Sequence, residues 1–130
     1  MPAFPSDVLA AAMAAREVEM TTTGRASGRP HRTTLWIWGD GTRLFVRSGG
    51  GLGRDWPQNL LADPAAVLHL GDRAVPVRAR PVTDPAEARQ GAAWITAKYG
   101  GERHPSPPDG PLDPAEAATF ELLPDDGAAG

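Results

Sequence analysis

Short stretches of alternating apolar and polar residues, separated by tight turns, are the feature that most limits how this chain can fold. The clearest is residues 32–38, where Trp36 and Trp38 are expected on one face of a strand. Gly39-Asp40-Gly41 follows as a strong hairpin signal, and residues 44–48 return as the second strand. The pattern predicts an antiparallel sheet built from hairpins.

The other expected elements are equally short. Strands are expected over residues 17–23, 66–70, 75–82 and 119–123, and helices over residues 6–16, 55–62 and 84–99. Ser6 or Asp7 is expected to cap the first helix, Asp55 the second and Asp84 the third. Residues 102–114 are rich in Pro and Gly and are expected to form a loop. About six strands with three peripheral helices predict a mainly β, α+β domain shaped as a small antiparallel barrel.

The content of large apolar residues is thin for a domain that must bury its core alone. Ala accounts for 22 of the hydrophobic residues, whereas Leu, Ile, Val and Phe together total 23 of 130. Small domains bury a smaller fraction of their surface. We therefore expect one domain over residues 1–130 that completes its core as a homodimer. Within it we expect an N-terminal helix or arm at 1–16, a barrel at 17–123 and a loose tail at 124–130.

Composition also excludes several classes of protein. No apolar run approaches 18 residues and no secretory signal is visible, so we expect no membrane span and a cytoplasmic location. Cysteine is absent, and the three His show no ligand spacing, so no metal site is expected. A net charge of −3 argues against nucleic-acid binding. Lys98 is the single lysine beside 12 Arg, a bias typical of GC-rich, actinobacterial-type genomes.

A first basic cluster lies in the turn-rich residues 24–32. It includes Arg25, Ser27, Gly28 and Arg32. Arginine offers a planar fork of donors suited to phosphate or carboxylate, and glycine lets the backbone approach a ligand closely. A solvated, positively charged hairpin explains the same residues equally well.

A second basic cluster surrounds the Gly-rich residues 49–53. Arg47 and Ser48 precede this segment, and Arg54 follows it at the start of the second expected helix. A helix N-terminus has free N–H groups and a partial positive charge, and both favour anions. A flexible connection with ordinary surface arginines is the alternative. From the sequence alone, the two basic clusters need not converge on one ligand.

Other residues favour structural roles. His69 lies within a strand pattern and is expected to be a satisfied structural histidine. Trp36 and Trp38 could stack on a flat ring, but core or dimer packing is the commoner use of such a pair. Lys98 and Tyr99 end the third helix, where the lysine favours the helix dipole, although the phenol could also donate to a substrate.

The order of these segments resembles the deazaflavin-dependent nitroreductase family. The resemblance lies in residues 22–35 (TTGRASGRPHRTTL), 46–50 (VRSGG) and 56–64 (WPQNLLADP), and it covers roughly residues 20 to 82. That family belongs to the split β-barrel group of flavin and deazaflavin oxidoreductases, which includes pyridoxamine-phosphate oxidase.

The resemblance implies a homodimeric split β-barrel with a phosphate-bearing cofactor near the dimer interface. The cofactor would be a deazaflavin coenzyme (F-420 type) or FMN, and the reaction a hydride transfer to a small organic acceptor. It places Arg25, Ser27, Arg32, Ser48 and Arg54 near the cofactor phosphate or tail, and Thr33 and Thr34 near its ring system. Gly28, Arg47, Gly49 and Asn59 complete the expected cofactor-binding set.

Two alternatives to a reductase stay open at this point. A non-catalytic carrier or sensor would bind the same cofactor, and a cofactor-free dimeric barrel would bind none. Ala26 stands where the family usually has Lys, which favours the carrier somewhat. Binding separates the barrel from the other two, and turnover separates the reductase from the carrier.

Overall fold

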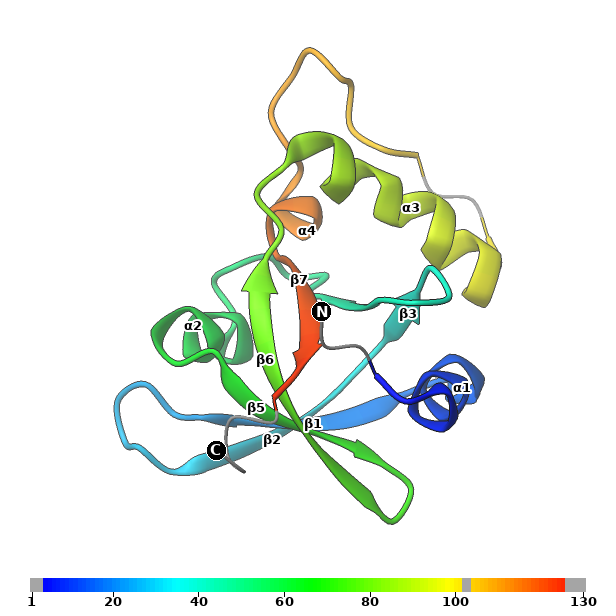
Figure 1. Ribbon diagram of the computed structural model, residues 1–130. Coiled ribbons are helices and arrows are strands. Elements are labelled where there is room, and N and C mark those ends of the chain that lie inside the picture. Colours follow the sequence, from blue (N-terminus) through cyan, green and yellow to red (C-terminus); the bar gives the residue numbers. More distant parts are fainter. Residues whose placement is uncertain (1–3, 102–103, 126–130) are drawn as a thin grey trace.

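A single antiparallel sheet, curled into a half-barrel, forms the centre of the computed structural model, which describes residues 4–101 and 104–125 (Figure 1). Its strands are β1 (Val18–Thr23), β2 (Pro30–Leu35), β3 (Ile37–Gly39), β4 (Leu44–Arg47), β5 (Ala65–Leu70), β6 (Arg73–Pro81) and β7 (Thr119–Pro124). The helices are α1 (Ser6–Ala14), α2 (Asp55–Ala62), α3 (Pro85–Tyr99) and α4 (Pro114–Ala117). The strand order is β2-β1-β5-β6-β7-β4-β3, which confirms the predicted class of fold.

The predicted strand at residues 32–38 is two strands, so the described sheet has seven strands rather than about six. β2 pairs with β1 at one edge of the sheet, whereas β3 pairs with β4 at the other edge. The chain therefore crosses the open side of the half-barrel at Trp36, which belongs to neither strand. The alternating pattern continues through the crossing, which is why the sequence did not reveal the break.

Two apolar clusters fill the described structure. The larger lies inside the curled sheet and is closed by α1 and α2. It includes Met20, Ile37, Leu44, Leu68 and Phe120. The smaller lies beneath α3, where Trp38, Phe45, Val82, Ala88 and Ile95 pack together. The second cluster holds α3 over the β3–β4 end of the sheet, and this placement creates the pocket described below.

The first two helices begin where predicted but are not capped by the predicted residues. α1 starts after Pro5, so neither Ser6 nor Asp7 caps it, and Asp7 instead forms an ion pair with Arg73. α2 starts after Arg54, which provides no side-chain cap, so Asp55 occupies the first turn and is not the cap. The first N–H groups of α2 are therefore left without a side-chain acceptor.

The other helices follow local capping signals. Asp84 caps α3 by accepting a hydrogen bond from the Ala86 N–H, as predicted, and Gly100 follows the last residue of the helix. α4 lies within the predicted loop and is a correction to it. Asp113 and Glu116 form a reciprocal capping box that supports this single turn. No described helix is long and apolar enough to cross a membrane.

The remaining boundaries shift by one or two residues. α1 ends at Ala14 rather than at residue 16, and Pro124 belongs to β7 rather than to a loose tail. The rest of the predicted tail, residues 126–130, lies outside the described residues, as do residues 102–103 of the predicted loop.

Candidate functional site

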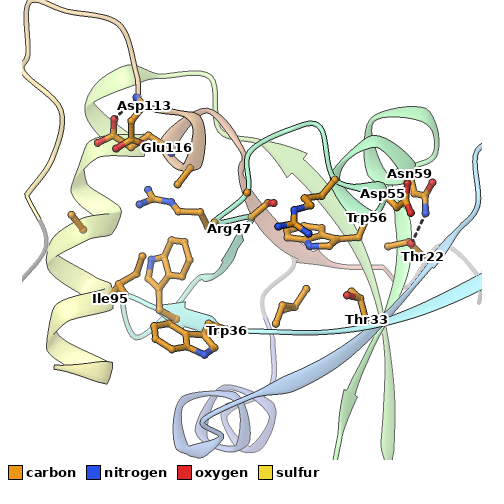
Figure 2. A pocket seen from close by; sticks show the side chains of 18 of the residues that line it. Thr22, Thr33, Trp36, Arg47, Asp55, Trp56, Asn59, Ile95, Asp113 and Glu116 are labelled. Atoms are coloured by element: carbon orange, nitrogen blue, oxygen red, sulfur yellow. Dashed lines mark hydrogen bonds between the residues drawn. The ribbon is translucent and has the colours of Figure 1, made fainter. Parts of the chain in front are cut away.

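A large pocket of about 840 Å³ opens on the side of the half-barrel where the chain crosses from β2 to β3 (Figure 2). The end of β4, Gly49, Gly50 and the start of α2 form its roof. α3 and α4 close one end, and β1 and β2 form the other. The pocket therefore lies where the two predicted basic clusters meet.

Three indole rings contribute to the pocket wall. Trp36 is 40% exposed and stacks on Tyr99, with 4.0 Å between ring centroids and 10° between planes. Trp38 is only 2% exposed and lies beside Ile95, and Trp56 lines the opposite end. Figure 2 shows Trp36 and Ile95 on the α3 side and Trp56 on the α2 side. Such flat apolar walls suit a planar ligand.

Arg54 lies at the roof of the pocket, where the Gly-rich segment enters α2. A Cβ on Gly50 would lie 2.3 Å from Arg54 Nε, so the arginine side chain folds closely over Gly50. The Arg54 guanidinium is exposed and makes no hydrogen bond or ion pair with a described residue. With the uncapped first turn of α2 beside it, this corner has free donors for an anion.

Ser48 adds a hydroxyl donor to the same corner. The residue is 3% exposed, yet its hydroxyl makes no hydrogen bond with a described residue, whereas its backbone N–H donates to Ala118 O at 3.0 Å. The Ser48 hydroxyl oxygen is not fully buried in the described structure, so a ligand can reach it. It faces a pocket to which Thr33 also contributes.

Asn59 links α2 to the sheet below the pocket. Its Nδ2 donates to Thr22 Oγ1 at 3.1 Å, and its Oδ1 accepts from the Arg25 backbone N–H at 3.1 Å and from Arg25 Nη1 at 3.0 Å. Arg25 also lies 3.5 Å from the carboxylate of Asp55. The Arg25 contacts tie the turn after β1 to α2. Figure 2 shows the Asn59–Thr22 hydrogen bond as a dashed line. Asn59 and Arg25 therefore position the site.

Arg47 occupies the α3 end of the pocket. Its Nε donates to Thr119 Oγ1 at 2.8 Å, and its Nη2 donates to the Ala88 carbonyl at 2.5 Å. The guanidinium carbon lies 5.3 Å from the centroid of the Trp38 ring. Burial lowers the pKa of Arg47 below its ordinary value, but the group stays charged because arginine titrates far above neutral pH.

A buried carboxylate closes this end of the pocket. Glu116 is 1% exposed and accepts hydrogen bonds from the Ser106 N–H at 3.0 Å and the Asp113 N–H at 3.0 Å. Burial acts to raise the pKa of Glu116, but these bonds, with that from the Ser106 hydroxyl, lower it overall. The carboxylate is therefore occupied by the loop that leads into α4.

The structure brings most of the predicted site residues together. The pocket is lined by Arg32, Thr33, Arg47, Ser48, Gly49, Arg54 and Asn59. The other four predicted residues, Arg25, Ser27, Gly28 and Thr34, do not line it. Ser27 accepts a hydrogen bond from the Arg29 N–H, and Arg32 forms an ion pair with Glu19 at 2.9 Å. Cofactor binding by this set stays a prediction.

His69 is satisfied as predicted, whereas Lys98 donates to carbonyls of other segments and not to those at the end of its own helix. His69 Nε2 lies 2.8 Å from Thr21 Oγ1, which satisfies this strand histidine. Lys98 donates to the carbonyls of Ala12 and Ile37, and Tyr99 also hydrogen-bonds Ile37, so both fasten the end of α3. Burial lowers the pKa of Lys98. Neither Lys98 nor Tyr99 lines the pocket.

Sequence reasoning missed the contribution of the C-terminal third of the chain. Ala92, Ile95, His104, Asp113 and Glu116 all line the pocket. The capping pattern from Asp113 to Glu116 was the one local signal available for this region. Trp38 packs in the core beneath α3, whereas Trp36 remains 40% exposed, so the two indoles have different environments.

Comparison with known proteins gives a family and a fold. The model of the F420H(2)-dependent quinone reductase family matches residues 13–101. A search of curated proteins finds no match. Among solved structures, a candidate pyridoxamine 5′-phosphate oxidase from Listeria innocua is similar, with a TM-score of 0.67 at 14% identity over 92% of each chain.

Two further solved structures are similar. An F420-H2 dependent reductase has a TM-score of 0.56 at 19% identity, over 82% of this chain and 93% of that one. A protein described as a domain-swapped dimer has a TM-score of 0.58 at 21% identity, over 82% and 79%. At such identities the likeness shows the fold, which is the split β-barrel that the sequence resemblance implied.

Proposed function

This chain belongs to the F420H(2)-dependent quinone reductase family, and from that premise we propose that it binds a reduced deazaflavin and passes a hydride to a small organic acceptor. One observation carries the proposal. The pocket combines flat indole walls with a free arginine and a free hydroxyl at an uncapped helix start. This combination suits a planar ring joined to a phosphate.

The donor set fits such a cofactor. Arg54 and Ser48, with the first N–H groups of α2, would hold the phosphate. Trp56 and Thr33 would lie along the ring. When bound, the deazaflavin supplies the hydride chemistry, and the protein binds it, orients it and limits the access of water. FMN carries one phosphate and a similar ring, so it is the alternative cofactor.

We expect the deazaflavin to quench the fluorescence of the pocket tryptophans in a saturable titration. Affinity should fall as salt rises, because a charge-assisted contact holds the phosphate. A parallel titration with FMN compares the two cofactors directly. If neither cofactor quenches at low salt, the cofactor-free barrel is the better account. Binding without reduction of any test acceptor would favour the carrier.

We also propose a homodimer. Trp36 remains 40% exposed, at the open side of the half-barrel beside the unpaired edge of β2. A similar structure is described as a domain-swapped dimer, which supports this reading. An exposed large apolar side chain at an open sheet edge is a common interface feature.

Replacement of Trp36 by aspartate is expected to weaken the dimer roughly 10- to 100-fold, because it would bury an unpaired charge. Sedimentation of the wild-type and variant chains at micromolar concentration measures this. Trp94 is a similarly exposed indole on α3, at 38%, and Trp94→Asp is the control. Only monomer in the wild type would remove the prediction. Weakening by Trp94→Asp alone would move the interface to α3.

A further inference from the structure

Arg47 is held in one position by its surroundings. The bonds to Thr119 and Ala88 fix two of its three nitrogens, and the guanidinium lies over the Trp38 ring. Gly91 makes room for it, because a Cβ there would lie 2.5 Å from Nη2. The side chain therefore has little rotamer freedom left to lose when a ligand binds.

The rest of this guanidinium is unused. Nη1 of Arg47 makes no hydrogen bond with a described residue. This nitrogen is not fully buried, and Arg47 lines the pocket, so a ligand there can reach it. No carboxylate of a described residue lies within 4.0 Å of Arg47. Asp113 and Glu116 act on it only at longer range, and Glu116 is occupied by Ser106. Arg47 is thus a half-buried cation without a direct counter-ion in the described structure.

The neighbours of Arg47 limit the shape of such a counter-ion. Trp36, Trp38, Ala92 and Ile95 line this end of the pocket, and Figure 2 shows Trp36 and Ile95 on its α3 side. Apolar walls favour a flat hydrocarbon ring, whereas the guanidinium fork favours the planar oxygens of a carboxylate. Arg54 lies on the opposite, α2 side of the pocket, where it packs on Gly50.

We propose that the α3 end of the pocket is an acceptor subsite for planar acids, with Arg47 as the residue that selects the anionic group. The inference rests on the proposed function, because it assigns the acceptor to the end away from the cofactor phosphate. It separates Arg47 from the cofactor-binding set in which the sequence placed it. Arg47 is then a specificity-determining residue, and a neutral acceptor would leave its charge unmatched.

A purely structural role for Arg47 makes a different prediction. An arginine that only joins β4 to β7 and α3 would not distinguish a charged ligand from a neutral one of the same shape. The matched probes are naphthalene-2-carboxylate and 2-acetylnaphthalene, which differ by one ionised oxygen in place of a methyl group. Both are titrated against the cofactor-free chain by tryptophan fluorescence.

The wild type is expected to bind the acid about tenfold more tightly than the ketone, as the loss of a charge-assisted hydrogen bond implies. Arg47→Met should remove this preference and leave ketone affinity unchanged. Arg47→Lys keeps the charge without the fork, and it should retain part of the preference if Arg47→Met does not fold. Arg29 is exposed and lies outside this pocket, so Arg29→Met is the control.

Equal wild-type affinity for the two probes would overturn the proposal, as would equal losses for both in Arg47→Met. The acid should also bind when the deazaflavin is already bound. Mutual exclusion would assign Arg47 to the cofactor ring and overturn the acceptor subsite. If acid selectivity is present but no cofactor binds, the proposed function fails while the acid site stands, so the two failures are distinguishable.

Discussion

Replacing Arg54 by alanine is expected to weaken binding of the phosphate-bearing cofactor roughly 10- to 150-fold. A charge-assisted hydrogen bond contributes about 1.5–3 kcal/mol, and about 1.4 kcal/mol corresponds to a factor of ten. The guanidinium has no other partner among the described residues, so its loss leaves no broken network in the protein. The free energy of unfolding without cofactor should change by less than about 0.5 kcal/mol. Fluorescence titration and chemical denaturation measure the two quantities.

The control for Arg54 is Arg29. It is exposed, it lies outside the pocket, and it belongs to the neighbouring turn, so it experiences a similar general field. Arg43 is unsuitable as a neutral surface control, because it pairs with Asp40 at 2.8 Å and with Glu87 at 2.9 Å. Equal losses for Arg29→Ala and Arg54→Ala would mean that only the general field matters. Unchanged affinity in Arg54→Ala would mean that residues 49–53 are a plain connection.

Local signals explain the parts of the fold that the sequence predicted well. The Gly39–Gly41 hairpin and the Asp84 cap each depend on residues within one turn of chain, and both are present. The break at Trp36 depends instead on which strands the chain meets, β1 before it and β4 after it. The alternation of side chains does not show where the chain changes from one strand to the next, because both strands have the same period of two.

The candidate site also combines neighbours that sequence order predicts with contacts that depend on long-range packing. Ser48, Arg54 and the start of α2 lie within one short segment, so their proximity followed from sequence order. The bond from Arg47 to Ala88 spans 41 residues and depends on α3 packing across the end of the sheet. A sequence shows that Gly91 is a glycine, but not that its missing Cβ makes room for a distant arginine. Long-range packing is therefore what the sequence reading lacked.

Arg25 was predicted to bind an anion, but its contacts in the structure are with other residues of the protein. The sequence identified it as an anion-binding arginine, and its residue type and its Gly-rich neighbours justified that. In the structure it donates to Asn59 and lies beside Asp55, and it does not line the pocket. Arg25 therefore already has partners within the protein, and it supports the site indirectly, by binding Asn59.

Replacing Asn59 by alanine is expected to lower the free energy of unfolding by about 2–3 kcal/mol. Asn59 is 1% exposed, and its amide joins Thr22 on β1 to the Arg25 backbone and side chain. Truncation leaves buried partners without hydrogen bonds, and each such group costs about 1–3 kcal/mol. The melting temperature should fall by roughly 6–12 °C. Chemical denaturation of the cofactor-free chain gives the free energy directly.

The matched control is Gln58→Ala, on the same helix. Gln58 is half-buried, and its side-chain amide makes one hydrogen bond, from Nε2 to the Leu52 carbonyl at 2.7 Å. Its loss should cost only about 1 kcal/mol. Asn59→Ala should also weaken cofactor binding although the side chain carries no charge, because the turn containing Arg25 would no longer be tied to α2. Equal destabilisation by the two variants would show that the buried link to Thr22 and Arg25 contributes nothing special, and that α2 is held by its apolar face alone.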